Sequence, residues 1–278
     1  MSLREGMNMD WSKIKTIFIV TFLILNIYLL NEFYKKYDSS QYDYVSETSF
    51  ENKLKTEEIE YVELPKNVKK NALISATPRK FSKDDLMELT NTILKGQTIT
   101  IKNETTIESE LQEPFPIKED FNLEELAPLL KNHVFQGEQY RFWKVDEAEQ
   151  TITYYQQIDG KQLYKNVSGE LTFYLDKENR ITGYKQTLLE NIEELSEEEN
   201  IHQPIKAIET LYENGRLPFG SKITKVELGY YTLVHLTSSQ VLTPVWRVVL
   251  DKEEDIFVDA FFEGNIIQLD NEDQKIVE

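Results

Sequence analysis

The chain has 278 residues, with 49 Asp and Glu against 31 Lys and Arg, and it contains no Cys. Residues 1–31 carry a net charge of +1, so residues 32–278 carry −19 of the formal total of −18. So negative a surface repels nucleic-acid phosphates, and we expect no nucleic-acid partner. The absence of Cys excludes disulfides, thiolate nucleophiles, iron–sulfur clusters and Cys-ligated zinc. The length allows one large domain or two small ones.

A long apolar run lies near the N-terminus. Residues 16–31 carry no charge, and this pattern predicts a transmembrane helix over residues 14–31. Trp11 precedes the run and Phe33 follows it, as expected for aromatic residues at membrane interfaces. A cleaved signal peptide and a buried soluble helix are the alternatives. No small-residue cleavage pattern follows the run, which favours an uncleaved signal anchor.

Asn26 is the one strongly polar side chain well inside this run. A membrane helix can tolerate an amide near its outer third, or the amide can hydrogen-bond to a partner helix, which contributes about 0.6–2 kcal/mol. Both interpretations stay open at this point. Together with its neighbours Phe22, Leu29 and Leu30, Asn26 forms the predicted site of transmembrane helix contacts.

The segment after the run predicts a stalk and then a small α+β unit. Residues 32–45 are polar and aperiodic, so we expect a stalk there, and residues 46–116 form the predicted unit. Its expected elements are an amphipathic helix over 46–58, a strand over 72–81, a helix over 82–95, a strand over 98–101, and an acidic, Pro-punctuated connection over 104–116.

The remainder of the chain repeats one order of elements. A helix over 123–131 precedes strands over 140–145, 151–157, 169–175 and 181–188, and a helix over 204–214 precedes strands over 222–231, 241–250 and 255–262. One hairpin aligns with another at an offset of 75, because Leu175 to Glu178 match Leu250 to Glu253. We therefore predict a duplicated helix-plus-antiparallel-sheet module within 117–268, with halves at 117–190 and 196–268, followed by an acidic tail at 269–278. The predicted fold class is α+β.

Strand alternation assigns faces to these predicted sheets. In the strand at 241–250, Trp246, Val248 and Leu250 are expected on one face and Val245, Arg247 and Val249 on the other, with the module's helix covering one face only. Adjacent tyrosines at 154–155 and 230–231 must point to opposite faces, so one ring of each pair is a candidate for a protein interface.

The sequence contains few motifs that are typical of catalytic or metal-binding sites. His133, His202 and His235 lie in separate segments without metal-ligand spacing, and neither a G-x-S-x-G motif nor a glycine-rich phosphate loop is present. The acidic run at 190–199 lacks the pattern of a calcium loop and predicts a solvated linker or first helical turn. We therefore predict no catalytic, metal-ligating or cofactor-binding residues, and no enzyme.

Three segments together resemble the YycI family. They are the N-terminal Met9-Asp10-Trp11-Ser12-Lys13 with the apolar run that follows, the segment Ala72 to Ala76, and the stretch from Gly229-Tyr230-Tyr231 to Thr243-Pro244-Val245-Trp246-Arg247-Val248. The resemblance extends over nearly the whole chain from Met9. The predicted helix-plus-sheet modules are similar to YycH-like and PepSY-like domains, which bind more often than they catalyse.

The resemblance implies a membrane-anchored accessory protein of Gram-positive bacteria. Residues 1–13 would be a short cytoplasmic N-terminus and the domain after the anchor would be extracytoplasmic. The implied partners are a YycH-like protein, the sensor histidine kinase WalK (YycG) and the cytoplasmic membrane, and contacts among transmembrane helices would carry much of the regulation. Two alternatives remain, a ligand-binding sensor for a cell-wall fragment and a cell-wall hydrolase.

Overall fold

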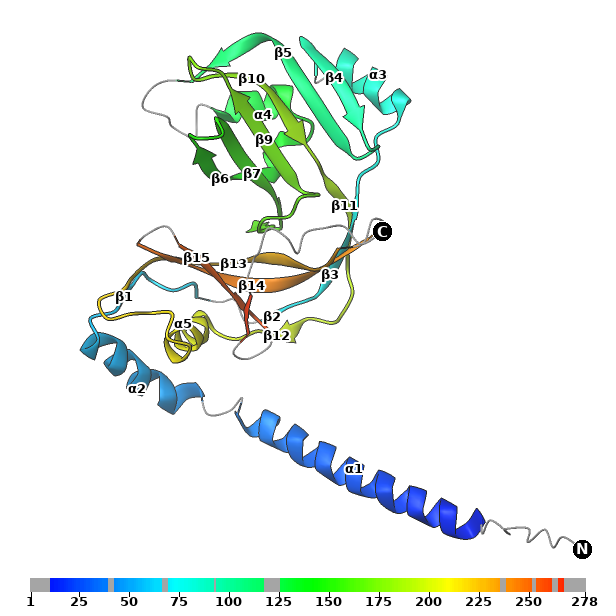
Figure 1. Ribbon diagram of the computed structural model, residues 1–278, viewed down its shortest axis with the longest axis vertical. Coiled ribbons are helices and arrows are strands. Elements are labelled where there is room, and N and C mark those ends of the chain that lie inside the picture. Colours follow the sequence, from blue (N-terminus) through cyan, green and yellow to red (C-terminus); the bar gives the residue numbers. More distant parts are fainter. Residues whose placement is uncertain are drawn as a thin grey trace, which may run out of the picture. The chain divides into compact units, whose positions relative to one another are not determined.

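The computed structural model describes residues 11–39, 43–66, 70–92, 94–117, 126–235, 239–251, 254–261 and 265–267. The chain divides into two compact units, residues 1–57 and 58–278. The expected acidic tail at 269–278 lies outside the described residues, as do residues 1–10 of the expected cytoplasmic segment. Figure 1 shows the elements in chain order.

The first unit consists of two helices, α1 (Trp11–Ser39) and α2 (Asp43–Thr56). Because α1 continues to Ser39, residues 32–39 are helical although their polar sequence shows no periodicity. The stalk over 32–45 stays a prediction. In α2, Phe50 and Leu54 are buried, as the i, i+4 spacing of an amphipathic helix predicts.

The second unit contains two seven-stranded sheets, formed by the residues that the structure describes. In the first, named sheet I here, the strand order is β4 (Gln97–Lys102), β5 (Thr106–Pro116), β10 (Arg180–Gln186), β9 (Glu170–Leu175), β7 (Thr151–Ile158) and β6 (Tyr140–Asp146), with β8 (Lys161–Gln162) paired to β7. Every pairing in it is antiparallel.

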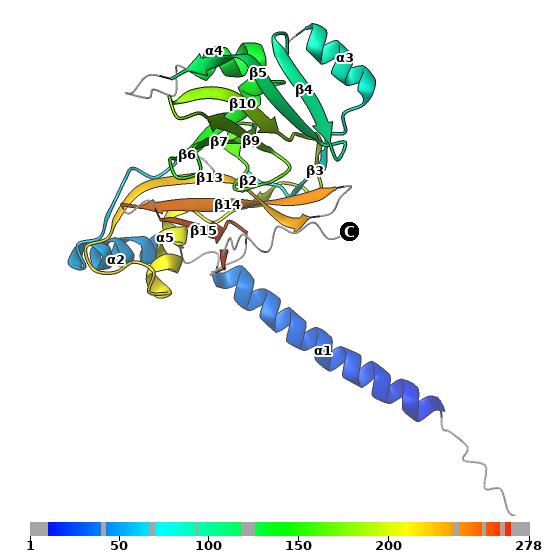
Figure 2. The same ribbon diagram turned by 45° about the horizontal axis from the view of Figure 1, so that its top comes forward.

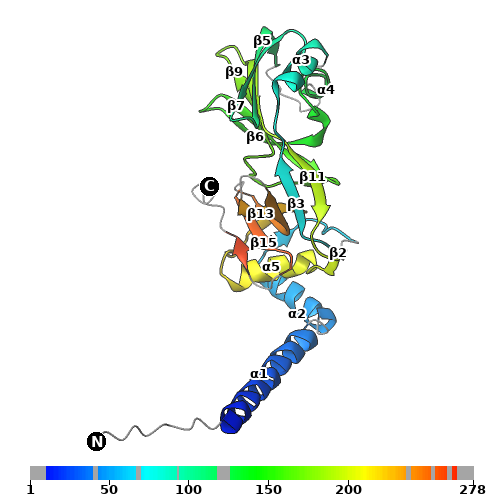
Figure 3. The same cartoon turned by 90° about the vertical axis from the view of Figure 1, so that its right-hand side faces the viewer.

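Two helices cover one face of sheet I, α3 (Lys83–Asn91) and α4 (Ala127–His133), and η2 (Gly137–Gln139) follows α4. Figure 3 shows both helices on the same side of the strands. Ser82 caps α3, because its hydroxyl accepts from the Asp85 backbone N–H while the Asp85 carboxylate accepts from the Ser82 N–H. Leu89 and Leu129 from the helices join Tyr154 and Phe173 from the strands in one buried cluster.

The second sheet, named sheet II here, contains the longest described strand, β13, with 14 residues. Its order is β1 (Glu60–Tyr61), β13 (Lys222–His235), β14 (Gln240–Leu250), β15 (Asp255–Asp259) and β16 (Ile266–Ile267); β14 also pairs with β3 (Ile74–Pro78), which pairs with β11 (Leu189–Glu194). Figure 2 shows β13 and β14 side by side. Helix α5 (Pro204–Glu213) contributes to this half, and β2 (Lys70–Asn71) pairs with β12 (Glu199–Asn200).

The chain enters and leaves sheet I through neighbouring strands of sheet II. It runs from β3 into α3, and after β10 it returns through β11, whose Leu189 pairs with Pro78 of β3. Residues 79–188 are therefore a single insertion in sheet II. The antiparallel pair β3/β11, which we name the ribbon, connects the two sheets.

Several boundaries differ from the sequence-based predictions. Residues 46–116 do not form a sheet of their own, because β4 and β5 complete sheet I while β1 and β3 belong to sheet II. The expected connection over 104–116 is wrong, since it contains the 11-residue strand β5. Part of the acidic run at 190–199, expected as a linker, is strand β11.

The expected hairpins at the offset of 75 are both present. β9 ends at Leu175 and β10 starts at Arg180, while β14 ends at Leu250 and β15 starts at Asp255. Their registers differ, because Ile181 pairs with Leu175 whereas Ile256 pairs with Val248. The α+β class, with an N-terminal apolar helix and antiparallel sheets, is confirmed.

Candidate functional site

Helix α1 contains the predicted site residues. Its segment Ile14–Phe33 has 20 residues, a mean hydropathy of 1.9, and no buried share. At 1.5 Å per residue this segment is about 30 Å long, the thickness of a bilayer's hydrocarbon core. By length and composition, α1 can therefore cross a membrane as a single anchor.

Four of its residues follow a heptad spacing along one face. Phe22, Asn26, Leu29 and Phe33 are separated by four, three and four residues, the pattern of d and a positions in paired helices. All four are exposed, as is Leu30, which adjoins Asn26 on the helical net because it lies four residues later. The residues predicted from the sequence, Phe22, Asn26, Leu29 and Leu30, therefore lie along one exposed stripe of α1. A polar residue at a single a position is a feature that sets the register of paired helices.

Thr21 is another uncharged polar side chain of α1, and it differs from Asn26. Its hydroxyl donates to the Ile17 carbonyl at 2.9 Å, so its donor is satisfied within the helix. The amide of Asn26 has two donor hydrogens and one acceptor oxygen. The backbone of its own helix cannot pair all of these groups. Asn26 is therefore the residue on this stripe with hydrogen-bonding capacity for a neighbouring helix.

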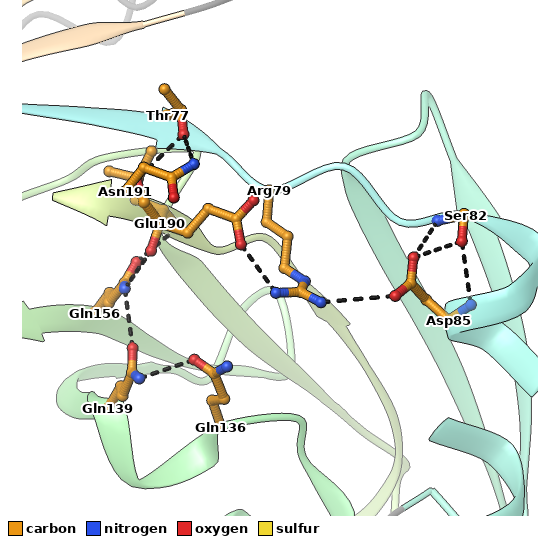
Figure 4. A network of polar contacts seen from close by, with 10 residues as sticks. Thr77, Arg79, Ser82, Asp85, Gln136, Gln139, Gln156, Glu190 and Asn191 are labelled. Carbon is orange, nitrogen blue, oxygen red and sulfur yellow. Dashed lines mark hydrogen bonds and ion pairs between the residues drawn. The ribbon is translucent and has the colours of Figure 1, made fainter. Parts of the chain in front are cut away.

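The second unit contains a polar cluster where the ribbon meets sheet I (Figure 4). Arg79 directly follows β3, and its guanidinium donates to Glu190 of β11 at 2.9 Å and lies 3.7 Å from Asp85 of α3. The same guanidinium lies over the Phe81 ring at 5.4 Å and the Phe135 ring at 5.0 Å. One cation therefore joins both strands of the ribbon to the first helix of sheet I.

A second cluster lies between β6 of sheet I and the strands of sheet II. Glu227 of β13 accepts from Arg141 of β6 at 2.9 Å and from Arg247 of β14 at 2.9 Å, and Arg247 also donates to Asp255 at 2.6 Å. Arg247 lies over the Trp143 ring at 4.1 Å. Burial alone would raise the pKa of Glu227, but Arg141, Lys225 and Arg247 outweigh it and keep the pKa below 4.5.

A third cluster fixes the connection between β8 and β9 on sheet II. Asn166 donates to Thr232 at 2.5 Å and to Gln240 at 2.7 Å, and its carbonyl accepts from the Ser168 N–H at 2.8 Å. Gln240 in turn donates to Ser168 at 2.7 Å. All four residues are buried. Such a satisfied network fixes one geometry of the two sheets, because any shift leaves buried amides unpaired.

The faces of β14 are both covered. Trp246 and Val248 are buried on one face, and the Trp246 indole donates to the His202 carbonyl at 2.9 Å, just before α5. Val245, on the other face, is also buried, in a cluster with Tyr164 and Phe257. The helix covers one face, and the connection from sheet I covers the other.

The tyrosine pairs do not provide the expected exposed rings. Tyr154, Tyr155 and Tyr230 are buried, and Tyr231 packs against the cluster of Val245. Tyr155 meets Trp143 edge to face, with ring centroids 5.6 Å apart. The prediction that one ring of the 154–155 pair is available to a partner is therefore wrong.

The described residues of the second unit show no grouping of the three histidines. The three histidines lie on different elements, with His133 in α4, His202 before α5 and His235 at the end of β13. Within the described residues, no group of three or more His, Cys, Asp or Glu side chains could hold a metal ion. The polar clusters that the structure shows join elements of the chain to each other.

Comparisons with known proteins identify the family. An uncharacterized protein from Eubacterium rectale, known from a crystal structure, is 14% identical with a TM-score of 0.45, over 72% of this chain and 87% of that chain. The C-terminal domain of YpeB from Bacillus megaterium is 14% identical with a TM-score of 0.35, over 69% of this chain and all of that domain. Comparison with curated proteins gave no match. The family described as YycI protein matches residues 39–261, most of the chain, and the chain therefore belongs to the YycI family.

Proposed function

We propose that this chain is a non-enzymatic, membrane-anchored regulator of the sensor histidine kinase WalK, acting together with a YycH-like protein. The observation that carries the proposal is the family match over residues 39–261. YycI proteins are accessory proteins of the WalK system, which fits a chain whose described polar clusters serve packing. The apolar, unburied helix α1 supports a single-pass anchor.

In this proposal residues 1–13 are cytoplasmic, residues 14–31 cross the membrane, and the two sheets are extracytoplasmic. The strongly negative charge of residues 32–278 would then face the wall side. The lack of Cys suits either side of the membrane and does not bear on the orientation.

Regulation requires a difference in affinity for two states of the kinase. A partner shifts a two-state equilibrium only by as much as its binding free energies to the two states differ. The stripe of Phe22, Asn26 and Leu29 would pair with a kinase or YycH-like helix in one register, and the sheets would dock on the partner's extracytoplasmic part. Contacts such as Asn166 to Gln240 and Arg141 to Glu227 fix the region where the two sheets meet, which we name the junction. The two sheets would therefore move together.

Substitution of Asn26 tests the helix contact. Asn26→Leu removes the amide while keeping an apolar side chain of similar size, so we expect a three- to thirtyfold loss of association, corresponding to about 0.6–2 kcal/mol. Thr21→Leu is the matched control, because the Thr21 hydroxyl is already satisfied by Ile17. The measurement is co-purification of WalK and the YycH-like protein from membranes, together with the output of kinase target genes.

The two variants separate the possible results. Loss of co-purification with Asn26→Leu but not with Thr21→Leu supports the intramembrane hydrogen bond. Unchanged co-purification and unchanged target-gene output with Asn26→Leu overturn it. If crosslinking from α1 in cells captures neither a histidine kinase nor a YycH-like protein, the regulatory proposal itself fails.

A further inference from the structure

Strand β5 contains a large irregularity in the middle of sheet I. Its pairing with β10 changes register between Ile181, opposite Phe115, and Gly183, opposite Glu110. Four residues of β5, 111–114, therefore stand opposite the single residue Thr182. Bulges redirect side chains and interrupt pairing, and they are common beside binding sites.

A groove of about 600 Å³ lies on sheet I at this bulge. It is lined by residues of β4, β5, β9 and β10, among them Thr98, Glu108, Glu110, Gln112, Tyr174 and Thr182. Its volume falls in the range of roughly 300–1,000 Å³ that is usual for small-molecule sites. Thr98 and Glu110 are exposed, and Tyr174 is 42% exposed, so the groove is open to solvent.

The register explains how the groove forms. Glu110 pairs with Thr98 on one side and with Gly183 on the other, and Gly183 pairs with Tyr174. A Cβ atom on Gly183 would lie 2.2 Å from the Ser109 carbonyl oxygen, so no side chain fits there. Thr98, Glu110, Gly183 and Tyr174 therefore form a row across four strands. Because Gly183 has no side chain, the row has a gap there, between the Glu110 carboxylate and the Tyr174 ring.

The charges around this gap are uneven. Glu108 forms an ion pair with Lys102 at 2.6 Å, whereas Glu110 forms no ion pair with any other described residue. Partial burial raises the pKa of the Tyr174 hydroxyl, and the nearby carboxylates of Glu108 and Glu170 raise it further. An anionic ligand would be repelled here.

The hydrogen-bonding groups of the lining favour a ligand that both donates and accepts. Thr hydroxyls, the Tyr hydroxyl and the Gln112 amide can each donate and accept, while the carboxylates only accept. A sugar has the matching chemistry, because each of its hydroxyls donates and accepts and its C–H face can stack on an aromatic ring. An ammonium group only donates, so it could use the carboxylates and hydroxyl oxygens of the groove but not the N–H donors of Gln112.

We propose that this groove binds a neutral saccharide, with one ring stacked on Tyr174 and its hydroxyls bonded to Glu110 and the adjacent Thr98. The site lies within sheet I and includes no residue of α1, and it goes beyond the proposed regulation of a kinase. Failure of either proposal leaves the other intact, because saccharide binding needs neither WalK nor a YycH-like protein.

The test uses the full-length chain in lipid nanodiscs, which avoids sugar-based detergents. Chitotetraose and maltotetraose are titrated by calorimetry, with a trilysine peptide as the cationic comparison. Tyr174→Ala and Glu110→Gln change the groove, and we expect each to weaken saccharide binding by about tenfold or more. Phe219→Ala and Glu147→Gln are the matched controls, because Phe219 is 68% exposed, Glu147 is exposed, and neither lines the groove.

The proposal is supported if a tetrasaccharide binds and only the two groove variants weaken it. A circular dichroism spectrum unchanged by Tyr174→Ala shows that the variant is folded, and Tyr174→Phe should retain most of the affinity because it keeps the ring. The proposal is overturned if neither sugar binds up to about 10 mM. It is equally overturned if the sugars bind all variants alike, or if trilysine alone binds and loses affinity with Glu110→Gln.

Discussion

Helix α1 and the junction of the two sheets differ in whether their polar side chains are exposed or buried and hydrogen-bonded. In α1 the segment Ile14–Phe33 is unburied, and the amide well inside it, Asn26, lies on an exposed stripe. At the junction, Asn166 and Gln240 are buried and bonded to each other and to their neighbours.

The difference shows which parts of the chain are stabilised by its own contacts and which need a membrane or another helix. A buried, satisfied network needs no further partner and holds one arrangement. A largely apolar exposed surface with an amide well inside it gains free energy when a membrane and another helix surround it. Mutations at the junction should therefore change folding, and mutations on α1 should change association.

The largest expected effect comes from crowding the junction. Gly229→Ala places a Cβ about 2.4 Å from the Tyr164 ring and 2.5 Å from the Gln162 carbonyl oxygen, where β13 meets the β8–β9 connection. Since the carbonyl belongs to the backbone, the two sheets must separate, and we expect a loss of about 3 kcal/mol in the free energy of unfolding. Urea unfolding followed by tryptophan fluorescence measures it. Thr224→Ala, exposed on the same strand, is the control.

A smaller loss is expected when one amide of the network is removed. Asn166→Ala leaves Thr232 and Gln240 buried with unpaired groups, so the free energy of unfolding should fall by about 2 kcal/mol. The matched variant Asn91→Ala removes an exposed amide that bonds only to Met87. Equal urea midpoints for the two variants would show that the network does not stabilise the junction.

The ion cluster gives the junction a pH dependence. The pKa of Glu227 in the folded state lies below its ordinary value of 4.5, so its stabilising contribution is present above pH 4.5 and is lost as the pH falls through the lowered folded pKa. Glu227→Gln should cost about 1–2 kcal/mol at neutral pH. The difference between wild type and variant should shrink as the pH falls below 4.5. A difference that stayed constant with pH would contradict this account.

The smallest effect is expected at the surface. Lys66 and Glu63 form an ion pair at 2.6 Å, but both side chains are more than three quarters exposed. Solvent screens such a pair, so Glu63→Gln should leave the urea midpoint unchanged. A measurable loss would mean that ion pairs stabilise this protein outside the junction as well.

Local patterns in the sequence were enough to predict the apolar helix α1. Apolar composition over one continuous segment identifies such a helix without knowledge of any distant contact. The same holds for the cap of α3 at Ser82 and for the hairpin turns after Leu175 and Leu250, because each is specified by neighbouring residues.

The junction could not be predicted in this way. Arg79 and Glu190 are 111 residues apart in the sequence, and Asn166 and Gln240 are 74 apart. No periodicity within a segment encodes such pairs.

Strand β5 was missed for a different reason, because its prolines suggested a loop. Pro114 lies in the bulge and Pro116 at the strand's last position, and a missing N–H is tolerated at both places.

The ribbon has a consequence for how this domain can be altered. Since Pro78 and Leu189 are paired neighbours, the two ends of the 79–188 insertion begin side by side. Insertions with adjacent ends can be exchanged between proteins without disturbing the host sheet's connectivity. A transplanted sheet I would still need its own residues to cover Val245 and Phe257, which the β8–β9 connection covers with Tyr164. The ribbon therefore marks the point at which sheet I could be exchanged while the strands of sheet II keep their order.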